Sequence, residues 1–278
     1  MNRPPAPPNA DWLPRLHIAG RLMWWMAGVV AYCFGVAVVL DQTQSAKWPD
    51  GVEWTAVNGL VLGLLLVFRN KEAYDRWWEA RKHWGQLANE IRNLALKARA
   101  YAAVDDHQLA EFGALLIGFA TKLSEYLQTI PAAEPLHSAS DSGYTPPEAT
   151  VQRIYDTLAR WDRDNRLGNA AYLLDWHARG LIDSMGACMR IRNTPLPSSY
   201  RALLRHGIAF SLIAAPWSLL SELGYWGLPE LAVGFYFLLG IEFTAEVIEH
   251  PFGPERDDLP LAAYCQAIRQ SVEAALGK

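Results

Sequence analysis

The chain has 278 residues, of which 51% are hydrophobic and 19% are charged, and its net charge is −4. Soluble domains usually carry about 25% charged residues, so this composition favours apolar segments alternating with polar helices and excludes a disordered chain. Nucleic acid is not expected as a partner because the chain has no basic surplus. Three widely separated cysteines predict neither a disulfide framework nor a zinc knuckle.

The first apolar run extends from Leu22 to Leu40 without a charged residue. At about 1.5 Å per residue, a helix of this length nearly crosses the hydrocarbon core of a bilayer. It is too long and too aromatic for a signal peptide, so a retained transmembrane helix is predicted. Arg15 and Arg21 precede the run and Asp41 follows it, which places the N-terminus in the cytoplasm by the positive-inside rule.

Three shorter apolar runs follow at residues 54–68, 207–221 and 231–241. Each is short for a membrane span, so its polar ends must be covered by protein or face water. Arg69 and Lys71 mark a cytoplasmic end after the second run, which predicts an antiparallel hairpin of the first two helices. The four predicted membrane helices are residues 22–40, 52–70, 205–223 and 228–246.

Residues 71–202 form a polar block that is long enough for its own core. Its apolar residues recur at steps of three and four, which is typical of helices, as at Leu109, Phe112, Leu116 and Phe119 and again at Leu173 and Trp176. Strand-like alternation is lacking, and a Pro- and Ser-rich stretch at 130–147 predicts a loop. We therefore expect an all-α membrane protein, a single domain over 1–278. The cytosolic helical part would comprise 71–202 and 247–278, with both termini in the cytoplasm and the membrane helices in the inner membrane.

Leu60, Leu64 and Phe68 are spaced at i, i+4 and i+8, so they share one face of the second predicted helix. Gly59 and Gly63 on the same helix have the G-x-x-x-G spacing that permits close helix packing. In a single chain the apolar stripe indicates core or lipid-facing surface. In a symmetric ring, however, it would form stacked apolar collars that can gate by dewetting.

Acidic residues gather after the fourth apolar run, where a Pro/Gly turn follows. Glu255 and Asp258 could bind a hard cation through their carboxylates, and Glu246 with His250 could bind a transition metal. The alternative is an acidic helix end with solvated charges. The sequence contains no G-x-S-x-G, P-loop, H-E-x-x-H or G-x-G-x-x-G motif, so neither an enzyme nor a cofactor is expected.

Three segments of the sequence stand out together: FRNKEAYDRWWEARKHWG (68–85), NTPLPSSYRALLRHG (193–207) and EHPFGPERDDLPL (249–261). They resemble the bestrophin family, and its prokaryotic branch most closely. Their order and spacing agree with that family from about Leu13 to Leu276. The resemblance implies a homopentameric ion channel in the lipid bilayer, with four membrane helices per subunit, a large cytosolic part and one pore along the five-fold axis.

The resemblance also implies two constrictions. The neck of the bestrophin pore is lined by three apolar residues, which correspond to Leu60, Leu64 and Phe68. The second constriction, at the cytosolic exit, is usually one apolar side chain and corresponds to Asn169 next to Gly168. Because these residues are polar or small, this aperture is expected to be wider or wetter than is usual in the family.

Animal bestrophins open on calcium through an acidic cluster after P-F-G and side-chain amides before it. Glu255 and Asp258 occupy acidic positions here, but Val247 and His250 stand where the amides would be. Arg256 interrupts the acidic run. A valine cannot coordinate a hard ion, so the resemblance does not extend to a full calcium clasp.

Both anions and cations are candidates for the conducted ion at this stage. Animal and plant bestrophins conduct anions such as chloride, whereas some bacterial members favour monovalent cations such as sodium. Glu242 and Glu246 lean towards cations, unless they pair with Arg69, Arg76 or Arg205. The main alternative to a channel is a membrane-anchored scaffold that binds a soluble partner through its cytosolic helices. A scaffold would need an exposed apolar patch there, and a channel would need a symmetric oligomer.

Overall fold

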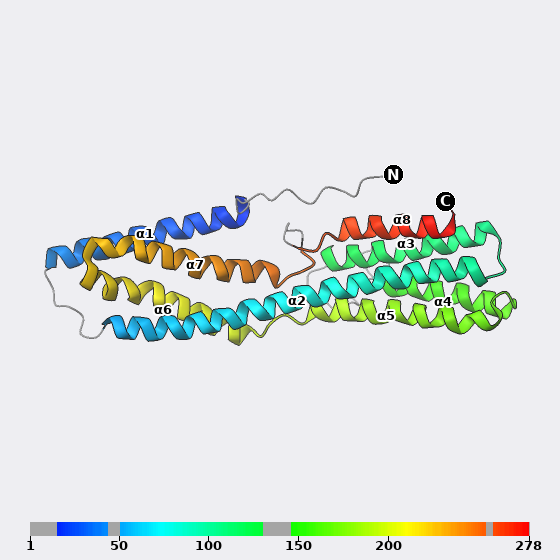
Figure 1. Ribbon diagram of the computed structural model, residues 1–278, viewed down its shortest axis with the longest axis horizontal. Coiled ribbons are helices and arrows are strands. Elements are labelled where there is room, and N and C mark those ends of the chain that lie inside the picture. The colour runs from blue at the N-terminus through cyan, green and yellow to red at the C-terminus, as the bar shows by residue number, and fades with distance from the viewer. Residues whose placement is uncertain (1–15, 44–50, 130–145, 254–257, 278) are drawn as a thin grey trace. The chain divides into compact units, whose positions relative to one another are not determined.

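The computed structural model describes residues 16–43, 51–129, 146–253 and 258–277. Within these ranges the structure is helical and contains no strand, which confirms the all-α prediction for the described part of the chain. Two short 3₁₀ turns, η2 (Gly168–Ala170) and η3 (Gly224–Trp226), join longer helices. The α-helices are α1 (Leu16–Thr43), α2 (Gly51–Tyr101), α3 (Asp106–Thr129), α4 (Pro147–Arg163), α5 (Ala171–Asn193), α6 (Ser198–Leu223), α7 (Gly227–Ile248) and α8 (Leu261–Leu276) (Figure 1).

Each of the four predicted membrane helices lies inside an observed helix, namely α1, α2, α6 or α7. The predicted loop at 130–147 lies outside the described residues except for its last two positions. The chain forms two compact units. The first unit comprises Met1–Ala73 and Leu196–Glu246, and the second comprises Tyr74–Pro195 and Val247–Lys278.

The first unit contains two stretches that are long and apolar enough to cross a membrane, Gly20–Thr43 and Ser198–Ile248. Only 22% and 28% of their most apolar windows are buried within the chain. Their apolar side chains therefore face outward, unlike those of a core helix in a soluble protein. Leu62 and Leu66 of α2 pack into the same apolar cluster as residues of α1, α6 and α7.

Pro216 interrupts the backbone ladder of α6, because proline cannot donate to the carbonyl four residues earlier. Two hydrogen bonds that share one side-chain hydroxyl lie next to this position. The hydroxyl of Tyr32 on α1 donates to the carbonyl of Ile213 at 3.0 Å, and the indole of Trp217 donates to the Tyr32 hydroxyl at 2.9 Å. A polar connection thus joins α1 to the proline region of α6 within an otherwise apolar unit.

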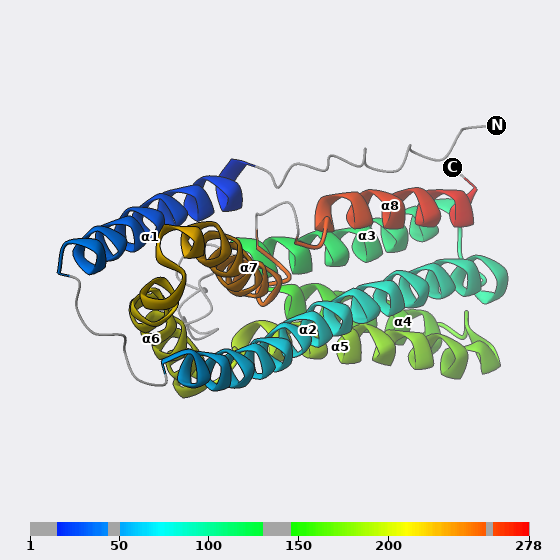
Figure 2. The ribbon, with the colours of Figure 1, turned by 60° about the vertical axis from the view of Figure 1, so that its left-hand side comes forward.

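The second unit is a helical bundle in which α3 lies between α8 and α4, and α4 lies along α5 (Figures 1 and 2). The apolar face of α4 shows why. Val151, Ile154, Leu158 and Trp161 recur at steps of three and four and are all buried. The ring of Trp161 packs against Phe112 of α3, with centroids 5.1 Å apart. Helical periodicity in the polar block therefore predicted a real core.

Candidate functional site

An apolar stripe runs along the outer face of α2. The side chains of Leu60, Leu64 and Phe68 are 76%, 56% and 51% exposed. Leu62 and Leu66 of the same helix are only 3% exposed, because they point into the core of the first unit. Large exposed apolar side chains on one continuous face indicate contact with lipid, contact with another protein surface, or a position in the wall of an apolar passage.

Five charged residues from four helices form a network in the first unit. Arg69 is fully buried, and its Nε lies 3.7 Å from Oε2 of Glu242. Arg205 approaches Oε1 of Glu242 at 3.9 Å and Oε1 of Glu246 at 3.1 Å. Arg21 lies 3.3 Å from Oε2 of Glu246. Three arginines therefore surround two carboxylates, and the network carries no negative surplus.

This network decides between two interpretations of the acidic residues. Both carboxylates are paired with arginines, so Glu242 and Glu246 do not form an uncompensated acidic cluster. Of the suggested partners, Arg69 and Arg205 are confirmed. Arg76 belongs to other contacts, and Arg21 was missed. Arg21 and Glu246 are 225 positions apart, so no local pattern could have indicated that pair.

Arg76 joins the three sequence segments that carry the family resemblance. Its Nε donates to the backbone carbonyl of Glu249 at 2.8 Å, its Nη1 donates to the carbonyl of Thr194 at 2.5 Å, and its Nη2 donates to the carbonyl of Ile191. The last two carbonyls close the C-terminal end of α5, a position that favours a cation. Burial lowers the pKa of Arg76, while the carboxylates of Glu249 and Glu79 act in the opposite direction.

The predicted aperture residues lie in η2. Gly168 and Asn169 are both exposed, and Gly168 has a φ of +50°, which favours glycine. Helix α5 begins directly afterwards, and Tyr172 and Trp176 on its first turns are 85% and 72% exposed. These aromatic side chains were missed as surface residues, since the sequence grouped Trp176 with an apolar helix face. The buried face of α5 instead contains Leu174, Ala178, Leu181, Met185 and Cys188.

Comparison with known proteins identifies the family of this chain. The family model described as bacterial/fungal bestrophin protein (Bestrophin_2) matches residues 11–274. The chain belongs to the bacterial and fungal bestrophin family. This membership confirms the resemblance of the three segments.

Relatives of this bestrophin are named voltage-dependent anion channel-forming proteins. The one from Nostoc sp. is 32% identical over 261 residues, which are 86% of this chain and 82% of that protein. YneE of Escherichia coli K12 is 28% identical over 280 residues, 92% of this chain and 90% of its own. These relatives are channel-forming proteins and not enzymes, and the prediction that this chain is not an enzyme is confirmed.

Solved structures show the same fold. A bacterial bestrophin homologue from Klebsiella pneumoniae superposes with a TM-score of 0.83 at 22% identity, covering 93% of this chain and 100% of that chain. Another structure, described only as a membrane protein, gives a TM-score of 0.82 at 21% identity, over 93% and 99% of the two chains. The helical bestrophin fold expected from the sequence is therefore confirmed.

Replacing Arg76 with alanine in this bestrophin should lower the free energy of unfolding by about 3 kcal/mol or more, because three carbonyl acceptors lose a charged donor. Arg76→Lys should recover only part of the loss, since an ammonium group cannot reproduce the planar fork. The measurement is denaturant unfolding in detergent. Arg179→Ala is the matched control, because Arg179 is largely exposed and pairs with Asp175 of the same helix. Equal losses of stability in Arg76→Ala and Arg179→Ala would contradict the proposed stabilising role of Arg76.

In the described part of the P-F-G turn, the candidate ligand Asp258 points into the turn. Asp258 is 7% exposed, and a Cβ on Gly253 would lie 2.5 Å from its Oδ2, so the carboxylate closes on the turn itself. A cavity of about 150 Å³ beside the turn is lined by Arg76, Arg192 and His250, and by no carboxylate of the described residues. Glu255 lies outside those residues, which also contain no group of three potential metal ligands.

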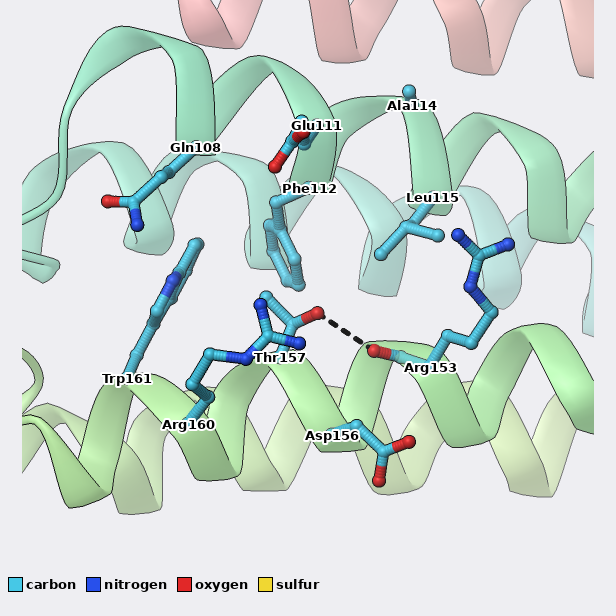
Figure 3. Close-up of a pocket in the computed structure, with 10 residues that line it drawn as sticks. All are labelled: Gln108, Glu111, Phe112, Ala114, Leu115, Arg153, Asp156, Thr157, Arg160 and Trp161. Atoms are coloured by element: carbon cyan, nitrogen blue, oxygen red, sulfur yellow. Dashed lines mark hydrogen bonds between the residues drawn. The ribbon is translucent and has the colours of Figure 1, made fainter.

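A second hollow lies between α3 and α4, and none of the candidate site residues predicted from the sequence lines it (Figure 3). It holds about 500 Å³, and the buried rings of Phe112 and Trp161 line it beside Arg153 and Arg160. The hydroxyl of Thr157 donates to the carbonyl of Arg153 at 2.9 Å within α4 (Figure 3). Carboxylates from both helices, Glu111 and Asp156, also line it. The hollow is therefore mixed in charge and favours neither anions nor cations.

Proposed function

We propose that this chain is one subunit of a homopentameric channel that conducts small monovalent anions, chloride among them, across the inner membrane. The observation that carries the proposal is the exposed apolar stripe of Leu60, Leu64 and Phe68 on α2. Family membership supports it, as do relatives from Nostoc, Synechocystis and Escherichia coli that are named anion channel-forming proteins.

The stripe supplies the pore neck when five copies meet on an axis. Each of the three side chains then contributes one apolar ring, and the rings stack one helical turn apart. An ion in such a neck loses water without gaining a polar partner, so a narrow neck stays dry and closed. The neck therefore controls how much current flows, and charge selection arises elsewhere.

The charge balance of the first unit supports anions. Its network contains Arg21, Arg69 and Arg205 against two carboxylates, so it adds no negative field to the path. The cytosolic exit is proposed at Gly168 and Asn169, where small and polar groups admit a hydrated ion. The exposed rings of Tyr172 and Trp176 would then border that exit.

The same network supports the proposed topology. It brings together the start of α1 (Arg21), the end of the apolar part of α2 (Arg69), the start of α6 (Arg205) and the end of α7 (Glu242). Helices that alternate in direction have these ends on one side of a bilayer. Arginines gather there, so that side is assigned to the cytoplasm, which leaves both chain termini inside.

The test is the reversal potential of purified protein in planar bilayers under a salt gradient, with the pentamer established by native mass measurement. A reversal potential close to that of chloride is expected. A value close to that of the cation would keep the channel and reverse its selectivity. Absence of current from confirmed pentamers, even after Leu64→Ala, would favour the scaffold alternative.

A further inference from the structure

Three ionisable side chains of the second unit form a hydrogen-bonded chain between α2 and α5. Nδ1 of His177 lies 2.6 Å from Oε2 of Glu90, and Nε2 of His177 lies 2.6 Å from Nζ of Lys97. Glu90 and Lys97 are seven positions apart on α2, so they lie on the same side of that helix, two turns apart. The single imidazole on α5 therefore bridges both of them.

This hydrogen-bonded group lies largely inside the helical bundle of the second unit. The side chains of His177 and Glu90 are only 12% and 18% exposed. Gly180, one turn after His177, makes room for the carboxylate, since a Cβ there would lie 2.8 Å from both Cγ and Cδ of Glu90. Any other residue at this position would push Glu90 away from the imidazole.

The geometry fixes the protonation state of the bridging ring. The carboxylate of Glu90 can only accept, so Nδ1 of His177 carries the proton and donates. The ammonium of Lys97 can only donate, so Nε2 of His177 accepts and carries no proton. Thus the observed contacts require a neutral imidazole between a cation and an anion.

We propose that His177 is a proton-binding switch whose protonation releases Lys97 and loosens the contact between α2 and α5. A proton on Nε2 would replace the hydrogen bond with two cationic groups 2.6 Å apart. Lys97 then has to turn towards solvent, whereas the contact with Glu90 becomes an ion pair. Histidine is the side chain whose charge normally changes between about pH 5 and 8.

Other ionisable groups near this part of α5 are engaged elsewhere. Asp175 and Arg179 lie 3.5 Å apart on α5, and both act electrostatically on Tyr155 of α4, as does Asp183. From α2, the groups that contact His177 are Glu90 and Lys97. The ionisable groups in hydrogen-bond contact with the imidazole are therefore one anion and one cation from α2.

The position of the switch gives it a consequence for conduction, and this step rests on the proposed function. His177 follows Trp176 and lies two turns after Asn169, where the cytosolic exit is proposed. Loosening the first turns of α5 at acidic pH would change the width of that exit. Current should accordingly depend on pH over the range in which histidine titrates.

The direct test is hydrogen exchange of the full-length protein from pH 5 to 8, corrected for intrinsic exchange rates and followed in peptides covering 171–181. Protection there should fall about tenfold on acidification, the loss expected for one hydrogen bond to a charged group. His177→Gln still offers one donor and one acceptor but cannot bind the proton, so its protection should not change with pH. Lys97→Met should show the acidic protection at every pH.

Glu90→Gln provides a readout that a merely structural role would not move. Removing the anion disfavours the imidazolium, so the protection change should move to lower pH. His107→Gln is the control, because His107 is 81% exposed and lies 3.8 Å from Glu111. That variant should leave the midpoint unchanged. Thermal unfolding at pH 8 identifies variants that fail to fold.

Conductance separates this switch from the channel proposal. Current that follows the same midpoint, and becomes pH-independent in His177→Gln, supports both. Protection that responds to pH as expected without any current would retain the switch and overturn the channel. Current without a pH step in residues 171–181 would overturn the switch and leave the channel standing, as would an unchanged midpoint in Glu90→Gln.

Discussion

Replacing Glu242 with alanine is expected to lower the free energy of unfolding of the first unit by about 3–5 kcal/mol. The side chain of Arg69 is fully buried, and Glu242 is 5% exposed. Truncation would leave a buried guanidinium without the carboxylate that faces it at 3.7 Å. The loss is measured by denaturant unfolding in detergent, followed by tryptophan fluorescence.

Two further variants show whether the Arg69–Glu242 pair is responsible for the loss of stability. Exchanging both partners, as Arg69→Met with Glu242→Leu, should recover most of the stability, because an apolar pair of similar volume needs no counter-charge. Glu246→Gln should cost less than about 1 kcal/mol, since Glu246 is about one third exposed and its pairs are screened by solvent. If Glu242→Ala were as mild as Glu246→Gln, Arg69 could not depend on this carboxylate.

Leu64→Ala should raise single-channel current several-fold, because it widens the middle ring of the proposed neck and lets water enter it. Leu64 is 56% exposed in the single chain, so its truncation leaves no cavity in the core of the subunit. Stability should therefore change little while current rises. The measurement is single-channel recording alongside thermal unfolding of the same preparation.

Leu62→Ala is the matched control on the same helix. Leu62 is 3% exposed within the first unit, so its truncation removes core packing and should cost about 2–5 kcal/mol. Its current per open channel should remain that of the unmodified protein. Raised current in Leu62→Ala, or unchanged current in Leu64→Ala, would place the neck on another face of α2.

The helices were predictable because their cause is local. Apolar steps of three and four gave α3 and α4, and uncharged runs gave α1, α6 and α7. The stripe on α2 was predictable for the same reason, since a spacing of four residues fixes a common face. Its exposure now agrees with that prediction, and its role as a neck stays a prediction.

Pairings between distant segments could not be read from one sequence. Glu90 and His177 are 87 positions apart, and Arg205 and Glu246 are 41 apart. Taken alone, each of these residues is of a type that is common on a solvated helix surface. Trp176 shows the reverse error, because an apolar residue at helical spacing was assigned to a buried face, whereas α5 turns Leu174 inward and leaves Trp176 exposed.

The hydrogen bond from Tyr32 to Ile213 has a consequence for how the membrane part is made. The two residues are 181 positions apart, so α1 leaves the ribosome long before α6. Pro216 cannot donate to the carbonyl of Leu212, and the Tyr32 hydroxyl binds the next carbonyl, that of Ile213, so α1 adds a polar contact where the backbone ladder of α6 is interrupted. The contact therefore forms only when the late-synthesised α6 reaches an α1 that has already been made.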